Sequence, residues 1–159
     1  MSSRSHHADD NEVVRNRIED SGFEGIAVVG SGPVASNRVA RNGALADAGG
    51  IAVIPLPDDP SETSDGNSLI ENVLDDNVGD GLYVGSGQAA TLLRENRSDR
   101  NTDDGIDVDS ASTTLTGNVA NRNADLGIEG VAGVTDAGGN RASGNGNPLQ
   151  CTNVFCQGR

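Results

Sequence analysis

Short apolar segments recur along the chain, and each begins with a glycine that is followed by alternating apolar positions. The steps are Gly25-Ile26, Gly50-Ile51, Gly81-Leu82, Gly105-Ile106 and Gly127-Ile128. A second small or apolar residue follows two positions after each first one: Val28, Val53, Val84, Val108 and Gly130. This alternation is typical of a strand with one buried face. No segment has a helical period long enough for the second half of a leucine-rich repeat. The pattern therefore predicts a repeat made of strands and turns.

Asparagines recur in pairs that are separated by the same short interval. The pairs are Asn37 and Asn42, Asn72 and Asn77, Asn96 and Asn101, and Asn118 and Asn123, whereas the first copy has Asn16 with Ser21 in the second place. Asparagine tolerates the left-handed backbone of tight turns, and its amide can hydrogen-bond to an amide stacked above it. We therefore predict asparagine columns at the turns. Asn96-Arg97-Ser98 matches a glycosylation acceptor, but a ladder asparagine that faces inward cannot be reached.

The spacing of the copies indicates a solenoid. The shortest separations slightly exceed twenty residues, which is the length of one coil of a parallel β-helix. The chain has 159 residues but only 34% hydrophobic and 2% aromatic residues, too few to fill an ordinary globular core easily. Low hydrophobicity is also a sign of disorder, but a disordered chain has no reason to keep Ile, Val and Leu at a fixed spacing. We predict an all-β, short parallel β-helix of about five coils, whose thin core is shared between neighbours.

Three regions follow from this pattern: a ragged segment over residues 1–10, the repeats over 11–134, and a Gly- and Asn-rich tail with a cap over 135–159. Proline and aspartate concentrate over residues 55–66, which we expect to project as an inserted loop. A shorter insertion lies between Asn42 and Gly50. No cap is recognisable before Asn11. We therefore expect a truncated start, and a first edge that associates with an upstream coil or with another copy.

The only cysteines, Cys151 and Cys156, lie in the tail. An even number of cysteines close together suits a small disulfide loop, which Leu149, Val154 and Phe155 would complete as an apolar lid over the last coil. The rival is metal binding, but two thiols without a nearby histidine make half a zinc site at best. A disulfide here indicates an oxidising compartment.

The chain is strongly acidic, with 24 Asp and Glu against 11 basic residues, all of them arginine. Binding to a phosphate backbone depends on clustered positive charge, so we expect no nucleic-acid partner. No apolar run approaches the roughly 20 residues that cross a bilayer. The N-terminus lacks the apolar stretch of a signal peptide. The protein is therefore cytoplasmic or is preceded by a segment absent from this chain, and we favour the second interpretation.

Two segments, ENRSDRNTDDGIDVDS and GNVANRNADLGIEGV, resemble the repeats of right-handed parallel β-helix proteins of the pectin-lyase-like superfamily. The resemblance covers the chain from about Asn11 to the cysteine-bearing tail, and this tail is similar to the ending of secreted bacterial members. The resemblance implies a right-handed coil and an extracellular or cell-surface location. The superfamily includes polysaccharide lyases, glycoside hydrolases, uronan epimerases and repeat proteins without a known reaction, so the motif is specific for architecture rather than for activity.

One heptapeptide, residues 101–107, resembles the Asn-Thr-Asp-Gly-Xaa-Asp element of polygalacturonases, with one extra aspartate. That family also requires a paired aspartate after a glutamine, a Gly-His-Gly and an Arg-Xaa-Lys, and none of these occurs in this sequence. The only histidines, His6 and His7, precede the repeats. The match is therefore better explained by the repeat pattern than by catalysis.

The most specific functional geometry lies in the last copies. If Ile106 and Val108 face inward, Asp107 and Asp109 face outward, and Glu129 lies one coil above Asp107. Adjacent coils are about 4.8 Å apart, so the carboxylates of Asp107 and Glu129 can approach to the separation used by retaining glycosidases or shared around a calcium ion. Asp107, Asp109 and Glu129 are accordingly the candidate calcium ligands.

Three interpretations of these carboxylates stay open: a solvated acidic surface, a calcium site, and the site of a polysaccharide-active enzyme that uses Asp103, Asp107 and Glu129. Stacked carboxylates need a basic or proton-sharing partner for catalysis, and the candidates are Arg100 and Arg122. Sugar binding favours aromatic platforms, which only Tyr83 is expected to provide, since Phe23 and Phe155 are assigned to the core and the lid. We predict a non-catalytic structural or carbohydrate-associated repeat module, with the enzyme as the alternative.

Overall fold

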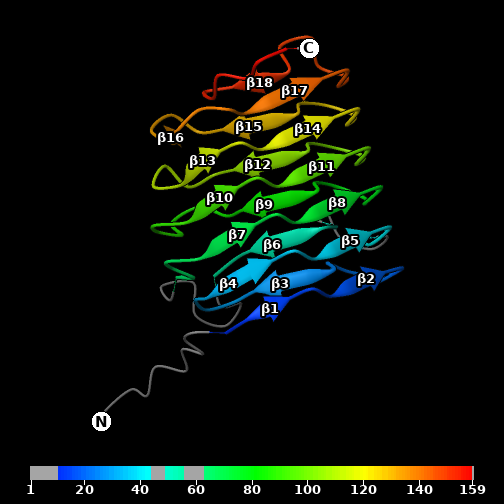
Figure 1. Ribbon diagram of the computed structural model, residues 1–159, viewed down its shortest axis with the longest axis vertical. Coiled ribbons are helices and arrows are strands. Elements are labelled where there is room, and N and C mark those ends of the chain that lie inside the picture. The colour runs from blue at the N-terminus through cyan, green and yellow to red at the C-terminus, as the bar shows by residue number, and fades with distance from the viewer. Residues whose placement is uncertain (1–10, 44–48, 56–62, 159) are drawn as a thin grey trace.

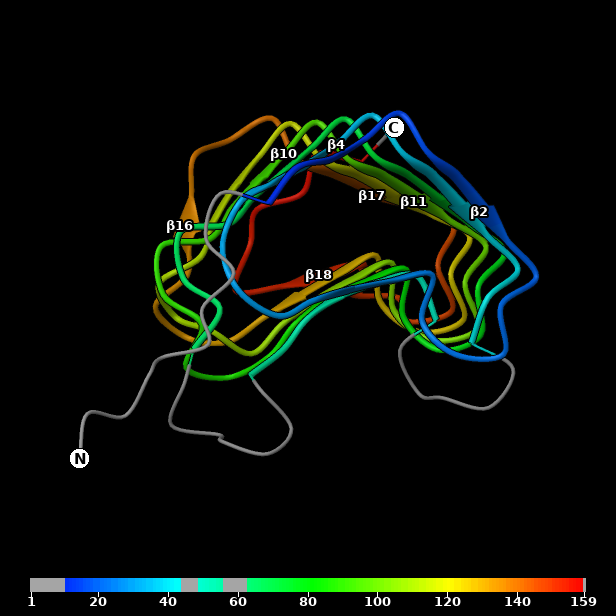
Figure 2. The ribbon, with the colours of Figure 1, turned by 90° about the horizontal axis from the view of Figure 1, so that it is seen from below.

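The computed structural model describes residues 11–43, 49–55 and 63–158. The chain winds into a stack of coils, and each coil contributes one short strand to each of three parallel sheets (Figures 1 and 2). Each sheet contains six strands, and five steps lead from the first strand to the last. The predicted all-β parallel solenoid of about five turns is therefore confirmed.

The three sheets are named A, B and C in chain order. Sheet A contains β1 (Val13–Val14), β4 (Pro33–Ala35), β7 (Ser68–Ile70), β10 (Leu92–Arg94), β13 (Thr114–Thr116) and β16 (Thr135–Asp136). Sheet B contains β2 (Arg17–Glu19), β5 (Arg38–Ala40), β8 (Val73–Asp75), β11 (Arg97–Asp99), β14 (Val119–Asn121) and β17 (Arg141–Ser143). Sheet C contains β3 (Ile26–Val28), β6 (Ile51–Val53), β9 (Leu82–Val84), β12 (Ile106–Val108), β15 (Ile128–Gly130) and β18 (Cys151–Thr152). The glycine–apolar steps of the sequence thus become the strands of sheet C.

The core is a set of aliphatic columns that run along the stack. In sheet A the middle residue of each central strand points inward, so Leu69, Leu93 and Leu115 lie in register and are fully buried. In sheet C the first residue of each central strand points inward, so Leu82, Ile106 and Ile128 lie in register. Each such side chain contributes about 1.5–3 kcal/mol by burial, so a chain with few aromatics can still form a stable stack.

Glycine precedes each strand of sheet C except the last, and at the corner there is no space for a Cβ atom. A Cβ on Gly105 would lie 2.5 Å from the Nδ2 of Asn123 and 2.6 Å from the carbonyl oxygen of Gly127. Real Cβ atoms do not approach other atoms so closely. The corner between sheets B and C therefore admits only glycine at this position.

Both predicted asparagine ladders are present, and they flank sheet B. The first contains Asn16, Asn37, Asn72, Asn96, Asn118 and Asn140, and the second contains Ser21, Asn42, Asn77, Asn101, Asn123 and Asn145. In each step between two asparagines one Oδ1 accepts two hydrogen bonds from the preceding coil, and in the Ser21–Asn42 step it accepts one. Asn118 accepts from the backbone N–H of Asn96 at 3.0 Å and from its Nδ2 at 3.1 Å. Asn96 is fully buried, as its ladder position predicts.

The left-handed backbone, however, belongs to the residue before each ladder asparagine. Glu95 has φ 55° and Arg100 has φ 59°, whereas Asn96 and Asn101 keep negative φ values. The sequence interpretation had assigned this conformation to the asparagines themselves. The asparagine must aim its amide along the stack, and the turn is therefore made one residue earlier.

The coils continue beyond residue 134, where we expected the repeats to end. β16, β17 and β18 pair with β13, β14 and β15, so the Gly- and Asn-rich tail forms a further coil. The predicted disulfide between Cys151 and Cys156 is present, with an S–S distance of 1.98 Å.

The predicted apolar lid is wrong in two of its three residues. Val154 is buried, but Leu149 is 70% exposed and Phe155 is 73% exposed. Neighbouring residues of an extended segment point to opposite sides, so the inward position of Val154 turns Phe155 outward. Phe23, which the sequence assigned to the core, is also exposed.

The end of the predicted 55–66 loop belongs to the coil. Ser64 is buried, its backbone N–H donates to Oε1 of Gln88 at 2.5 Å, and its Oγ donates to the carbonyl oxygen of Ile54 at 2.7 Å. Residues 56–62 of this loop, and residues 44–48 of the shorter insertion, lie outside the described residues. In the described part of the chain, no helix is long and apolar enough to span a membrane.

Candidate functional site

The outward column of sheet C changes character along the stack. The strand register aligns Ala27, Ala52, Tyr83, Asp107, Glu129 and Thr152. Glu129 therefore lies one coil beyond Asp107, as the sequence predicted. The column is small and apolar in its first two coils, aromatic in the third and acidic in the next two.

Two further carboxylates reach this region from the turns that precede sheet C. Oδ1 of Asp80 accepts a hydrogen bond from the backbone N–H of Asp104 at 3.0 Å, and Oδ1 of Asp104 accepts one from Leu126 at 2.6 Å. Each aspartate thus satisfies a backbone donor of the next coil. Sequence reasoning did not include Asp80 and Asp104, although an aspartate directly before the corner glycine in two successive copies was the available signal.

The carboxylates form two groups that share Asp104. Oxygen atoms of Asp104, Asp107 and Glu129 lie within 4.8 Å of one another, and so do those of Asp80, Asp103 and Asp104. We call these five residues the carboxylate cluster. Asp104 is buried, Asp80 and Asp107 are half-buried, and Asp103 and Glu129 are exposed. The cluster therefore extends from the interior of the turn to the surface of sheet C.

Burial and mutual repulsion raise the pKa values within the cluster. Burial, followed by the charges of Asp107, Asp103 and Glu129, raises the pKa of Asp80 to about 7, although the N–H of Asp104 opposes the shift. Burial and the neighbouring carboxylates raise the pKa of Asp107 to about 6.

Asp104 is the most strongly affected member. Its pKa is raised by burial and by the side-chain hydrogen bond with Glu129, whereas the N–H of Leu126 lowers it. A carboxyl group in this position donates its proton to a neighbouring carboxylate instead of repelling it. The raised pKa therefore favours the protonated form of Asp104, which reduces the repulsion within the cluster.

The predicted site residues are only partly brought together. Asp107 and Glu129 are neighbours, whereas Asp103 groups with Asp80 and Asp104 rather than with them. Asp109 is exposed and accepts a hydrogen bond from the hydroxyl of Tyr83 at 3.1 Å. Burial and this hydrogen bond raise the pKa of Tyr83 to about 12, so its hydroxyl stays protonated. Asp109 belongs to neither group of three.

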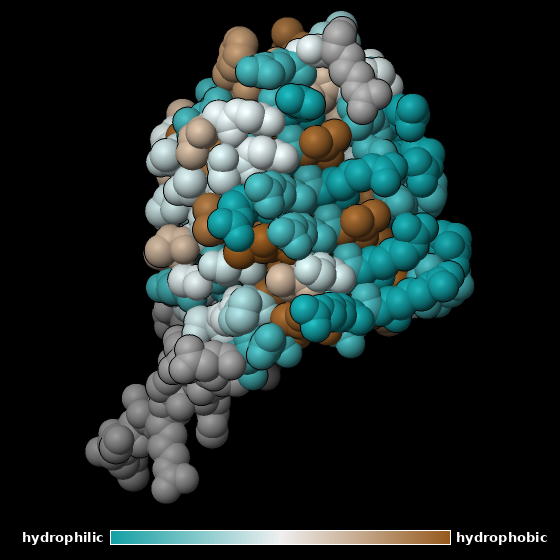
Figure 3. Space-filling model, in the orientation of Figure 1, coloured by the Kyte–Doolittle hydropathy of each residue, from teal (hydrophilic) through white to brown (hydrophobic). Residues whose placement is uncertain are grey.

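Arginines gather on sheet B instead. Arg17, Arg38, Arg97 and Arg141 lie in its strands, and Arg41, Arg100 and Arg122 lie directly after them. Hydrophilic residues dominate the right-hand side of Figure 3, over the strands of sheet B labelled in Figure 1, with a few hydrophobic residues between them. The Nε of Arg100 binds Asp76 at 2.8 Å, and the Nε of Arg41 binds Asp20 at 2.9 Å. Within the described residues, no ion pair joins an arginine to the carboxylate cluster, and this includes Arg100 and Arg122.

This arrangement suits the binding of a hard cation. Calcium takes carboxylate and carbonyl oxygens in a flexible geometry, and three carboxylates within 4.8 Å of one another are close enough to share one ion. Protonation of an aspartate in the cluster reduces the same repulsion. Cation binding and protonation are therefore alternative ways to stabilise one cluster.

Comparison with known proteins gives one match. A family model described as the right handed beta helix region matches residues 4–147. No curated protein and no solved structure matches the chain significantly. The matched region includes all the strands of sheets A and B and the first five of sheet C.

Proposed function

Because the chain belongs to the right-handed β-helix family, we propose that it is a non-catalytic structural or carbohydrate-associated repeat module of a secreted or surface protein. The supporting observation is the placement of charge: the carboxylate cluster lies on sheet C and its preceding turns, and the ion pairs of the described arginines lie on and beside sheet B. Hydrolysis or elimination on a polysaccharide needs a complete set of acid, base and charge-stabilising groups. The carboxylate cluster supplies acids and proton acceptors but lacks an arginine or a histidine among the described residues.

Tyr83 is the most suitable residue for contact with a sugar. Its ring lies beside the small side chain of Ala52 on one side and Asp107 on the other. The apolar face of a pyranose packs on an aromatic ring, and the carboxylate oxygens of Asp107 and Asp109 can accept hydrogen bonds from sugar hydroxyls. A neutral glycan fits this strip better than an anionic one, because the surrounding carboxylates repel negative charge.

Electrophoresis in gels that contain dissolved polysaccharides tests this proposal. We expect neutral polysaccharides to slow the protein without being cleaved, and Tyr83→Ala to abolish the retardation. Tyr83 is half-buried, and Phe23→Ala is the control, because Phe23 is an exposed aromatic residue that lies outside sheet C. Equal migration of the wild-type protein with and without each polymer would reject carbohydrate association.

Calcium is the second candidate ligand, favoured by the convergence of Asp104, Asp107 and Glu129. Asp109 of the sequence-based ligand set belongs to neither group of three carboxylates, and we propose Asp104 as a ligand in its place. We expect millimolar calcium to raise the melting temperature relative to chelator, because a ligand that binds only the folded state stabilises it. Asp104→Asn should remove the difference, and Asp136→Asn, at a carboxylate outside the cluster, should preserve it. Identical melting of the wild-type protein in both conditions excludes the metal site.

The alternative function is a polysaccharide-active enzyme that uses Asp103, Asp107 and Glu129. The raised pKa values of Asp104 and Asp107 favour this alternative, because a general acid must hold its proton near neutral pH. The release of reducing ends from acidic and neutral polysaccharides is the direct measurement. If release occurs and Asp107→Ala leaves it unchanged, this site is not responsible.

A further inference from the structure

The first coil ends in a face that the rest of the structure does not pair. β1, β2 and β3 are the terminal strands of their sheets, and within the described residues each is hydrogen-bonded to a strand on one side only. Asn16 begins the first ladder. It donates its backbone N–H and its Nδ2 to Asn37, but no donor among the described residues reaches its Oδ1. Exposed strand edges of this kind readily pair with another chain.

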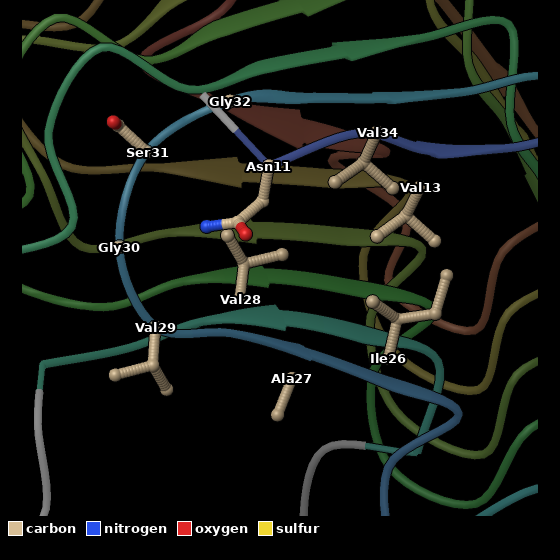
Figure 4. Close-up of a pocket in the computed structure, with 10 residues that line it drawn as sticks. All are labelled: Asn11, Val13, Ile26, Ala27, Val28, Val29, Gly30, Ser31, Gly32 and Val34. Atoms are coloured by element: carbon tan, nitrogen blue, oxygen red, sulfur yellow. The ribbon is translucent and has the colours of Figure 1, made fainter. Parts of the chain in front are cut away.

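A hollow of about 300 Å³ lies within this coil. Figure 4 shows the side chains of Val13, Ile26, Val28 and Val34 around it, whereas Ala27 points away. Val28 is half-buried, but the valines at the same position in the next coils, Val53, Val84 and Val108, are fully buried. The apolar core therefore reaches the first coil without being fully covered there by the described residues.

At the opposite end β16 and β18 are also terminal strands, but the chain itself closes both ladders and the core there. Nδ2 of Asn140 donates to Asp136 at 2.9 Å, and Nδ2 of Asn145 donates to Oε1 of Gln150 at 3.0 Å, so both ladders are terminated. Gln157 pairs with Arg141 in β17. The disulfide loop buries Val154 against the core of the last coil. A second copy therefore finds no open ladder or core at this end, and a head-to-tail fibre is disfavoured.

We propose that two copies of this chain associate through their first coils, base to base, about a twofold axis. Among the described residues, the open ladder and the incompletely covered core lie at the first coil, and a twofold interface uses the same face on both partners. The size is adequate: a standard interface contains roughly 20–30 residues a side, and one step of the first ladder spans 21 residues.

The charges on β2 are paired within the chain, despite the net charge of −13. On β2 the Nε of Arg17 binds Glu19 at 2.8 Å, and Glu19 also receives the guanidinium of Arg41 at 3.0 Å. The carboxylate cluster is carried by the third to fifth strands of sheet C and their preceding turns, away from β1, β2 and β3. The proposed interface is therefore independent of the sugar and calcium sites, and the dimer does not depend on the proposed function.

Sedimentation equilibrium of the full chain tests the dimer. We expect a mass of twice 16.2 kDa at high protein concentration and dissociation on dilution. Val28→Asp should give a monomer, because it places a charge in the apolar hollow. Val78→Asp is the matched control, since Val78 is 41% exposed and lies away from the first coil, and it should remain a dimer. A wild-type monomer, or a series of species larger than the dimer, overturns the proposal.

Amide hydrogen exchange of the wild-type protein gives a test that needs no variant and is unaffected if Val28→Asp does not fold. The amides of β1, β2 and β3 should exchange more slowly as the protein concentration rises, because association protects their open edges. The amides of β15 and β18 should not change. Concentration-independent exchange in β1, β2 and β3 contradicts the proposed interface.

Discussion

The asparagine ladders depend on a side chain that is short and that both donates and accepts. Oδ1 of Asn123 accepts two hydrogen bonds from Asn101, and Nδ2 of Asn101 donates to Oγ of Ser98 at 2.9 Å and to Oδ1 of Asn123 at 3.0 Å. An aspartate would lose the donors, and a glutamine is one methylene longer than the spacing between coils allows. Each ladder residue therefore fixes the turn of its own coil and its register with the next.

Replacement of one ladder residue should destabilise the whole stack. Asn101→Ala leaves buried donors and acceptors in two neighbouring coils unpaired, at a cost of about 1–3 kcal/mol for each group. We expect the free energy of unfolding in urea to fall by about 3 kcal/mol. Asn121→Ala is the control, because Asn121 lies outside the ladders and is only half-buried. Equal losses in the two variants would contradict a special role for the ladder.

The corner glycines should be equally intolerant of substitution. Gly105→Ala forces its Cβ against the amide of Asn123 and the carbonyl of Gly127, and overpacking of this kind costs about 1–3 kcal/mol or more. At Gly85 the nearest atom to an added Cβ lies 3.4 Å away, which is an ordinary contact. Thermal melting should therefore shift downward for Gly105→Ala and change little for Gly85→Ala. A similar shift in both would show that space is not the reason for the glycine column.

At the scale of elements, sheet C contains both the most regular part of the repeat and the candidate site. Its inward positions, such as Ile106 and Val108, follow from the alternation, whereas its outward positions vary from alanine to tyrosine to carboxylate. The repeat constrains only the face that it buries. The residues at the outward positions can therefore differ from coil to coil and can form a binding site.

The stability of this sheet should depend on pH through the carboxylate cluster. The pKa values of Asp80, about 7, and Asp107, about 6, lie above the unfolded value of about 3.9. The folded state thus binds protons more tightly than the unfolded state does. The resulting contribution to the free energy of unfolding is fully present below about pH 4 and is lost as the pH rises to about 7. We expect the free energy of unfolding to fall over that range in the absence of calcium.

Asp80→Asn should make this dependence shallower, because asparagine accepts the same hydrogen bond from Asp104 without titrating. Asp136→Asn is the control. Although burial opposes it, hydrogen bonds from Gly138, Phe155 and Asn140 lower the pKa of Asp136. The Asp136 carboxylate therefore contributes to the free energy of unfolding at neutral pH, and this contribution is lost only as the pH falls below the pKa of aspartate in the unfolded state. Urea unfolding that is flat between about pH 4 and 7 in the wild-type protein would contradict the raised pKa values.

At the scale of the molecule, the solenoid gives its sheets different surface charges. Acidic groups dominate the surface of sheet C, and arginine–carboxylate pairs cover sheet B. The two ends also differ: both ladders end on residues of the last coil, whereas in the first coil no donor among the described residues reaches Oδ1 of Asn16. A stack of similar coils thus presents distinct surfaces to distinct partners.

Reduction of the disulfide should weaken the closed end without unfolding the stack. The bond joins residues five apart, and a loop of this size contributes about 2 kcal/mol in the chain-entropy model. We expect reductant, or a double Cys151→Ser and Cys156→Ser variant, to lower the melting temperature while the circular dichroism of the folded state is retained. Complete loss of structure on reduction would mean that the cap is required for folding.

The sequence by itself determined the coil, the strands of sheet C and both ladders, because every copy needs apolar residues at the buried positions and asparagines at the stacked ones. It also determined the disulfide, because its only two cysteines lie close together. It did not identify sheets A and B, where strands of two or three residues carry one inward position and leave little periodicity to detect. Only the tertiary structure brought Asp80 and Asp104 to Asp107 and Glu129. These residues lie in different coils, and their distances depend on coil lengths and turn geometry that local patterns do not contain. The tertiary structure also decided that Phe155 points outward: Val154 packs against the core of the last coil, and the next residue of the extended segment therefore points to the opposite side.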